Sequence, residues 1–173
     1  MSAALKRGAA TVGAAAWLKR MEDSSILLGA ILKVVHPELY HTSLAGLLTL
    51  GGREPYEPVL QQWGTPFNAL SIIVNRQAPL HRDTQTRNEW YDMLLSIGDY
   101  SSAELHLPGL GLDFTYPSGT MVIFSGSLLR HGVTVRDADR ICIAHYMRDV
   151  VQDRLQTDIA GWATVADIEN IAV

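Results

Sequence analysis

A histidine and an aspartate stand two residues apart in the segment 78–83 and could hold a metal ion. In an extended chain, side chains at i and i+2 leave the same face, so His81 and Asp83 can converge on one ion while Arg82 points away. His131, forty-eight residues beyond Asp83, can supply a third ligand. Two imidazoles and one carboxylate, with the other positions open, are the ligand set of mononuclear non-haem Fe(II) sites. These three residues are therefore the candidate metal ligands and the candidate catalytic centre.

An arginine that could clamp an acidic co-substrate follows nine residues after His131. Arg140 opens an apolar, strand-like run, which would fix its position. A planar guanidinium binds a carboxylate through two parallel hydrogen bonds, each charge-assisted contact being worth roughly 1.5 to 3 kcal/mol. Arg136 and Arg148 are alternatives, although Arg136 falls in an expected loop and Arg148 could instead form a salt bridge at a strand end.

Several other residues could contribute to this centre. Asn75 lies six residues before His81 and could donate a hydrogen bond to the co-substrate or to a ligand, or simply shape a turn. Cys142 and Ala144 share the strand face of Arg140, and their small size would leave room for a co-substrate. The remaining histidines are alternative third ligands, although the first two fall in expected helices: His36, His41, His106 and His145.

Length and composition favour one domain spanning residues 1–173, because the chain is 173 residues long and 47% hydrophobic. The formal net charge is −4, but residues 1–20 carry four basic residues and no acid, which leaves −8 for the remainder. This basic arm could contact phosphates or could be a solvated helix face. The single cysteine, Cys142, excludes a disulfide framework and a cysteine zinc cluster within the chain, and it favours an intracellular location. The absence of an apolar run of roughly 20 residues argues against a membrane span.

The first part of the chain has a helical pattern. We expect helices over residues 3–20, from Asp23 or Ser24 to the residues before Pro37, and from Pro37 to Gly51. The segment 1–52 is expected to pack its helices on a sheet, and residues 53–68 are expected to form a loop with at most one short strand. The C-terminal tail, 149–173, is expected to begin as a helix.

From residue 69 onward the pattern changes to short β-prone runs separated by turn residues. Seven or eight short strands at this spacing suggest an antiparallel sandwich or barrel, so the fold class is mainly β with flanking α-helices. The expected strands cover residues 69–74, 90–97, 103–107, 112–116, 120–124, 128–135 and 141–147.

At this point the chain resembles the Fe(II)/2-oxoglutarate-dependent dioxygenases. Their His-x-Asp motif, distal histidine and following arginine are similar in order and spacing to His81, Asp83, His131 and Arg140. The resemblance covers residues 69–148. It implies a double-stranded β-helix of the jelly-roll or cupin type, an enzymatic activity, and the use of Fe(II), 2-oxoglutarate and dioxygen. It also implies that Arg140, with Asn75 and Arg148 as further candidates, binds the co-substrate.

Within that superfamily the chain looks most like the compact fungal members of the TET/JBP group. The likeness rests on residues 75–84, on the turn 117–120, and on residues 125–133. It implies oxidation of the methyl group of 5-methylpyrimidines, 5-methylcytosine or thymine, in DNA, hence a part in DNA demethylation and a nuclear location. The animal enzymes of this group carry a cysteine-rich zinc-binding extension, which a chain with only Cys142 cannot form.

A base in DNA must leave the stack to enter such a site, where an aromatic ring could hold it and basic residues could meet the phosphates. Tyr91 and Trp90, with Arg82 and Arg130, are the candidate substrate contacts. Each of these could instead be a packing residue or a solvated charge. The other candidates are Trp63, Tyr146, Arg76 and Arg87.

Two other functions stay open. One is a 2-oxoglutarate-dependent hydroxylase of a protein side chain or of a small molecule. The other is a catalytically inactive binding module of the same fold. The sequence does not fix the oligomeric state.

Overall fold

The computed structural model describes residues 9–53, 57–136 and 139–169. The chain divides into two compact units, Met1–Asn68 together with Gln152–Val173, and Ala69–Val151. The expectation of a single domain, with its first helices packed on the sheet, stays a prediction. None of the helices in the described residues is long and apolar enough to cross a membrane.

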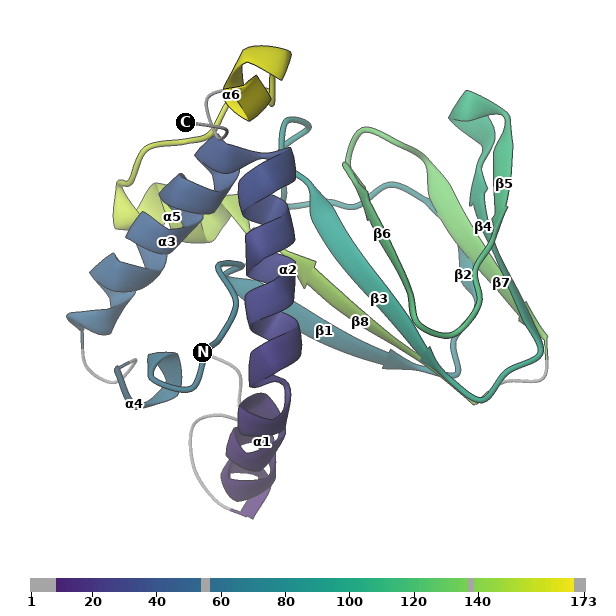
Figure 1. The fold of residues 1–173 in the computed structure, drawn as a ribbon, viewed down its shortest axis with the longest axis horizontal. Helices are drawn as coiled ribbons and strands as arrows, with labels where there is room; N and C mark the ends of the chain where they lie inside the picture. The colour runs from purple at the N-terminus through teal and green to yellow at the C-terminus, as the bar shows by residue number, and fades with distance from the viewer. Residues whose placement is uncertain (1–8, 54–56, 137–138, 170–173) are drawn as a thin grey trace. The chain divides into compact units, whose positions relative to one another are not determined.

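The first unit is helical, as the sequence predicts (Figure 1). The third helix begins at Pro37 as expected, and the buried side chain of His36 caps it by accepting the Leu39 backbone N–H at 3.3 Å. The second helix starts at Glu22, before the expected caps, and no side chain caps it. The helices of the first unit are α1 (Ala9–Arg20), α2 (Glu22–Val35), α3 (Pro37–Gly51), α4 (Glu57–Leu60), the end of α5 (Asp149–Leu155) and α6 (Val165–Glu169).

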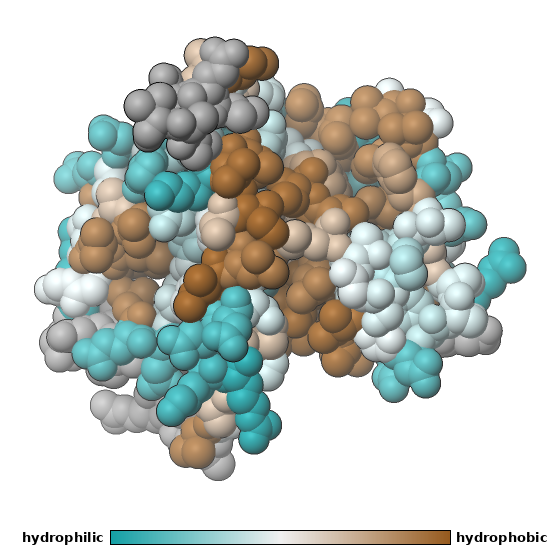
Figure 2. All heavy atoms as spheres, in the orientation of Figure 1, coloured by the Kyte–Doolittle hydropathy of each residue, from teal (hydrophilic) through white to brown (hydrophobic). Residues whose placement is uncertain are grey.

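Helices α2 and α3 pack through one apolar face. Leu28 and Leu32 of α2 and Leu39 of α3 are buried, which is the usual way a short helix gains stability beyond its intrinsic propensity. The other face of α2 is also apolar, with Ile26 and Leu27 more than half exposed at 56% and 59%. Figure 2 shows hydrophobic side chains gathered along α2.

The second unit contains eight strands in two four-stranded antiparallel sheets, in the orders β1-β8-β3-β6 and β2-β7-β4-β5 (Figure 1). This arrangement agrees with the expected double-stranded β-helix. The strands are β1 (Ala69–Val74), β2 (Ala78–His81), β3 (Asp92–Gly98), β4 (Ser102–Leu107), β5 (Leu112–Thr115), β6 (Thr120–Phe124), β7 (His131–Arg136) and β8 (Arg140–Tyr146), and the 3₁₀ turn η2 (Pro108–Leu110) joins β4 to β5.

The strand boundaries differ from the expectation at two functional places. Strand β2 was not expected as a separate element, because four residues containing a proline give little periodic signal. Strand β7 begins at His131 and not at residue 128, because residues 125–129 form a turn in which the Leu129 N–H donates to the Ser125 carbonyl at 3.0 Å. Both differences place a histidine at a strand end.

A cavity of about 450 Å³ lies between the two sheets of this unit. Side chains that alternate along the strands line this cavity. In β1, Ser71 and Ile73 face the cavity, while Ile72 and Val74 are exposed. Its size falls within the range of roughly 300–1,000 Å³ that is usual for small-molecule sites.

Candidate active site

Strands β2 and β7 bring the two predicted histidine ligands together. His81 and His131 are directly paired across the antiparallel ladder, although they lie fifty positions apart in the chain. Their ring centroids are 4.3 Å apart. Pairing at a common end of the two strands therefore creates a site that neither segment could form alone.

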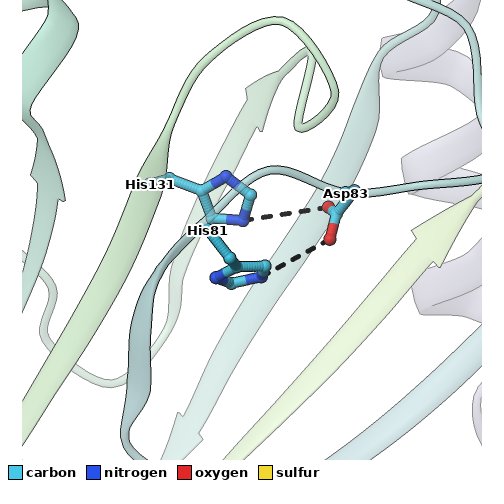
Figure 3. Close-up of side chains that lie close together, drawn as sticks. All are labelled: His81, Asp83 and His131. Carbon is cyan, nitrogen blue, oxygen red and sulfur yellow. Dashed lines mark ion pairs between the residues drawn. The ribbon is translucent and has the colours of Figure 1, made fainter.

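Asp83 completes the cluster from the segment that follows β2 (Figure 3). Its Oδ1 lies 3.4 Å from Nε2 of His81, and its Oδ2 lies 3.8 Å from Nε2 of His131. One ligand atom from each residue lies within 4.8 Å of the other two. The three side chains thus converge on one point beside the cavity that they line.

The histidine rings are held in the orientation that a metal ligand needs. Nδ1 of His81 lies 2.7 Å from the Pro79 carbonyl oxygen, and Nδ1 of His131 lies 3.0 Å from that of Leu129. Because a carbonyl can only accept, each Nδ1 carries the proton and each Nε2 presents its lone pair toward Asp83. Burial also lowers the pKa of His131, which favours its neutral form.

These observations test whether the residues fit an Fe(II) ion. Two neutral imidazole nitrogens and one carboxylate oxygen form the donor set of the 2-His-1-carboxylate facial triad. Side-chain exposures of 41% for His81 and 42% for Asp83 show that the cluster is open on one side. The donor set and its opening toward the cavity fit Fe(II) with further positions left for small ligands.

A buried carboxyl group that the sequence interpretation missed lies behind Asp83. The Asp83 N–H donates to the Gly126 carbonyl at 2.9 Å, and the Gly126 N–H donates to Oδ2 of Asp92 at 3.1 Å. Asp92 is 3% exposed. Burial raises its pKa to about 7, the charge of Asp83 adds to this, and the Gly126 N–H opposes it. A lone acidic residue in the apolar run 90–97 was the available signal.

Arg140 lies in the wall of the same cavity and is 3% exposed. Its Nε donates to Oγ of Ser96 at 2.8 Å, and its guanidinium lies 5.0 Å from the centre of the Tyr116 ring. Cys142 and Ala144 line the cavity beside it, as their small size and position on β8 predict. Burial raises the pKa of the Cys142 thiol.

Asn75 supports Arg140 through the backbone. It adopts a left-handed conformation with φ of 51°, which asparagine tolerates better than most residues. Its Oδ1 accepts the Arg140 N–H at 2.8 Å, and its own N–H donates to the Arg140 carbonyl at 2.8 Å. This geometry corresponds to the turn role that the sequence left open.

Arg148 also lines the cavity, together with Tyr146. Its guanidinium lies 5.1 Å from the centre of the Tyr146 ring and donates to the side-chain oxygen of Gln85. The Tyr146 hydroxyl lies 2.9 Å from Oγ of Ser71. Aromatic and cationic groups therefore form one wall of the cavity.

The other predicted substrate contacts are placed less favourably. Trp90 is 1% exposed, so its ring packs in the interior and offers no open face to a base. Tyr91 is half-buried and is not among the described residues that line the cavity. Arg82 and Arg130 are exposed, and Nε of Arg82 donates to the Leu128 carbonyl at 3.1 Å.

The alternative histidines lie elsewhere, because the cavity lining within the described part of the chain contains only two histidines, His81 and His131. His36 caps α3, as described above. His106 bonds to Asp113 at 2.7 Å on the sheet of β4 and β5. His145 is fully buried, and burial lowers its pKa to about 4.

A double-stranded β-helix that brings two histidines and an aspartate to the edge of an arginine-containing cavity is the architecture of a non-haem Fe(II) oxygenase. Residues 9–149 match the Tet_JBP family, described as the oxygenase domain of the 2OGFeDO superfamily, and the chain belongs to this family of enzymes. Enzymes of this superfamily use Fe(II), 2-oxoglutarate and dioxygen.

Solved structures support the same fold. The chain is similar to NgTET1, solved in complex with 5mC DNA, with a TM-score of 0.59 and 11% sequence identity. The similarity covers 99% of this chain but 62% of NgTET1, so the chain spans less than two thirds of that protein. Comparison with curated proteins gave no match.

Proposed function

We propose that this chain is an Fe(II)- and 2-oxoglutarate-dependent dioxygenase that oxidises the methyl group of 5-methylpyrimidines in DNA. The convergence of His81, Asp83 and His131 at the edge of the Arg140 cavity carries the proposal. Bound Fe(II), with 2-oxoglutarate and dioxygen, supplies the oxidising chemistry for an unactivated C–H bond. Membership of the Tet_JBP family supports the methylpyrimidine substrate.

The protein residues have distinct tasks in this proposal. His81, Asp83 and His131 hold the metal through Nε2, a carboxylate oxygen and Nε2. Arg140 binds the distal carboxylate of 2-oxoglutarate. Because Ser96 already accepts from Nε, the guanidinium is fixed in rotation before the co-substrate arrives.

The wall formed by Tyr146 and Arg148 is suited to hold the substrate base. An extruded base needs a flat apolar surface and hydrogen-bond donors for its exocyclic carbonyl oxygens. The Tyr146 ring offers the surface, and Arg148 offers donors next to it. Both line the cavity that the metal ligands also border.

Basic residues around the opening would offset the net negative charge where DNA approaches. Arg76 lines the cavity and is exposed, as are Arg82 and Arg130 near the two histidines. Such residues gain affinity by releasing counterions from phosphates, so binding should weaken steeply with salt. NgTET1, the similar structure, was solved with 5mC DNA. A nuclear location follows as part of this proposal.

The test has two stages. Anaerobic titration with Fe(II) and 2-oxoglutarate should give the weak visible charge-transfer band of the chelate. Air and a duplex containing 5-methylcytosine are then added, with mass analysis of the nucleosides. A parallel duplex with thymine but no 5-methylcytosine compares the two methylpyrimidines. We expect the band and a hydroxymethyl base.

His81→Ala should remove both signals, and His41→Ala is the matched control because His41 is an exposed histidine of α3. A band with 2-oxoglutarate turnover but no nucleoside product would contradict the DNA substrate and favour a hydroxylase of another molecule. A folded protein with no band would contradict the metal site and favour a binding module.

A further inference from the structure

We infer that Asp92 is a positioning residue for the metal ligands, acting through the backbone of Gly126. This inference rests on the metal site of the proposed function and does not depend on the DNA substrate. Asp92 opens β3, in the sheet opposite to the one that carries both histidines.

The Gly126 backbone connects the Asp92 carboxylate to the backbone of Asp83. Its N–H donates to Oδ2 of Asp92 at 3.1 Å, and its carbonyl accepts the Asp83 N–H at 2.9 Å. A side chain at this position has no room, since a Cβ would lie 2.6 Å from Oδ2 of Asp92 and would also collide with Oδ2 of Asp83. Glycine therefore lets both carboxylates approach the Cα of residue 126.

Gly126 also belongs to the turn that leads into His131. The Leu129 N–H donates to the Ser125 carbonyl at 3.0 Å, and the Leu129 carbonyl in turn faces Nδ1 of His131 at 3.0 Å. By fixing Gly126, Asp92 constrains the backbone on both sides of the cluster. Partners of metal ligands commonly tune affinity in this way, and their loss typically costs about 10- to 100-fold.

The environment of Asp92 supports this role over a purely structural one. A carboxyl group that is 3% exposed carries a large desolvation cost. Its Oδ1 is buried and has no hydrogen-bond partner among the residues that the structure describes. The bond to Gly126 is thus the contact that defines its orientation, and that contact leads to the metal ligands.

Ser96 offers a matched comparison on the same strand. Asp92, Leu94 and Ser96 alternate along one face of β3, and both polar members are buried. Ser96 contacts Arg140, whereas Asp92 contacts the Gly126 turn. If each residue acts locally, loss of Asp92 should weaken metal binding and loss of Ser96 should weaken 2-oxoglutarate binding.

The experiment measures two affinities by calorimetry, with Mn(II) in place of Fe(II). Asp92→Ala should weaken Mn(II) binding about 10- to 100-fold while 2-oxoglutarate binding to the Mn(II)-saturated protein changes little. Ser96→Ala should do the reverse. Asp92→Asn keeps an oxygen acceptor for the Gly126 N–H and should restore most of the Mn(II) affinity. Asp99→Ala, at an exposed aspartate just after β3, is the control for lost charge.

Three outcomes would overturn the inference. The first is unchanged Mn(II) affinity in Asp92→Ala. The second is an equal loss of both affinities in Asp92→Ala and Ser96→Ala, which would indicate general loosening of β3. The third is an Mn(II) affinity of Asp92→Asn that is as low as that of Asp92→Ala. Failure of the wild type to bind Mn(II) would instead remove the metal site itself, and a missing DNA product would leave the inference standing.

Discussion

The metal cluster and the surroundings of Arg140, which line the same cavity, are built in different ways. In the metal cluster, the side chains of His81 and Asp83 are 41% and 42% exposed, and short backbone contacts orient the histidine rings. Arg140, by contrast, is 3% exposed and is held by Ser96, Tyr116 and the Asn75 turn. Two of the three metal ligands are therefore accessible to small ligands from solvent, whereas Arg140 belongs to the folded interior.

Because of this difference in burial, substitutions at the two places should differ in their effects on activity and on folding stability. An exposed carboxylate costs little to remove, because water replaces its contacts in the apo protein. A buried arginine leaves unpaired neighbours when it is removed, so its loss affects folding as well as binding. Substitutions of the exposed ligands His81 and Asp83 should therefore affect activity alone, whereas substitution of Arg140 should affect both activity and folding.

The largest expected effect comes from Asp83→Ala. Loss of a metal ligand should lower turnover by about 1,000-fold or more, since the metal supplies the oxidising chemistry. The free energy of unfolding of the apo protein should stay close to that of the wild type. Product analysis and urea unfolding measure the two quantities. Retained activity would remove Asp83 from the mechanism.

Arg140→Ala is expected to have the next largest effect. Two charge-assisted hydrogen bonds of roughly 1.5 to 3 kcal/mol each would be lost, so the 2-oxoglutarate requirement should rise about 100-fold or more. Unfolding should also become easier, unlike in Asp83→Ala. Arg136→Ala, at an exposed arginine of β7, serves as the control. An unaltered requirement for 2-oxoglutarate would direct attention to Arg148.

His145 lies on β8, on the strand face opposite to that of Arg140, and its protonation should affect the stability of the interior. Burial lowers its pKa from 6.5 to about 4, so between these values the unfolded chain binds a proton that the folded protein does not. As far as this residue is concerned, the folded protein therefore keeps its full unfolding free energy above pH 6.5 and loses part of it as the pH falls toward 4. Between pH 7 and pH 5 the loss should be about 2 kcal/mol. His145→Leu should remove this contribution to the pH dependence of the unfolding free energy, measured by urea unfolding at several pH values. An unchanged pH dependence would contradict the lowered pKa of His145.

Asn75→Gly should have the smallest effect. Glycine tolerates the φ of 51°, so the substitution removes the acceptor for the Arg140 N–H without adding strain. We expect a loss of about 1 kcal/mol in unfolding free energy and a small rise in the 2-oxoglutarate requirement. Asn75→Ala should cost more, because alanine is strained at this φ. Equal stability of the two variants would show that the conformation contributes little.

Much of the fold could be predicted because its signals are local. Pro37 starts a helix, Gly51 ends it, and β-branched runs such as 69–74 and 120–124 form strands with the expected bounds. Strand β2 and the start of β7 could not be predicted in this way. Four residues with a proline carry no period, and the turn at 125–129 depends on its own hydrogen bonds.

The sequence by itself determined the chemical types of the site: two histidines, an aspartate and an arginine in an order that predicts metal and carboxylate binding. Only the tertiary structure decided which groups meet, because pairing of β2 with β7 aligns His81 with His131, and two sheets enclose the cavity. It also assigned Trp90 to the interior and placed Tyr146 in the cavity wall. The role of Asp92 was revealed only by its hydrogen bond with the Gly126 N–H, since a contact between β3 and a distant turn has no trace in local spacing.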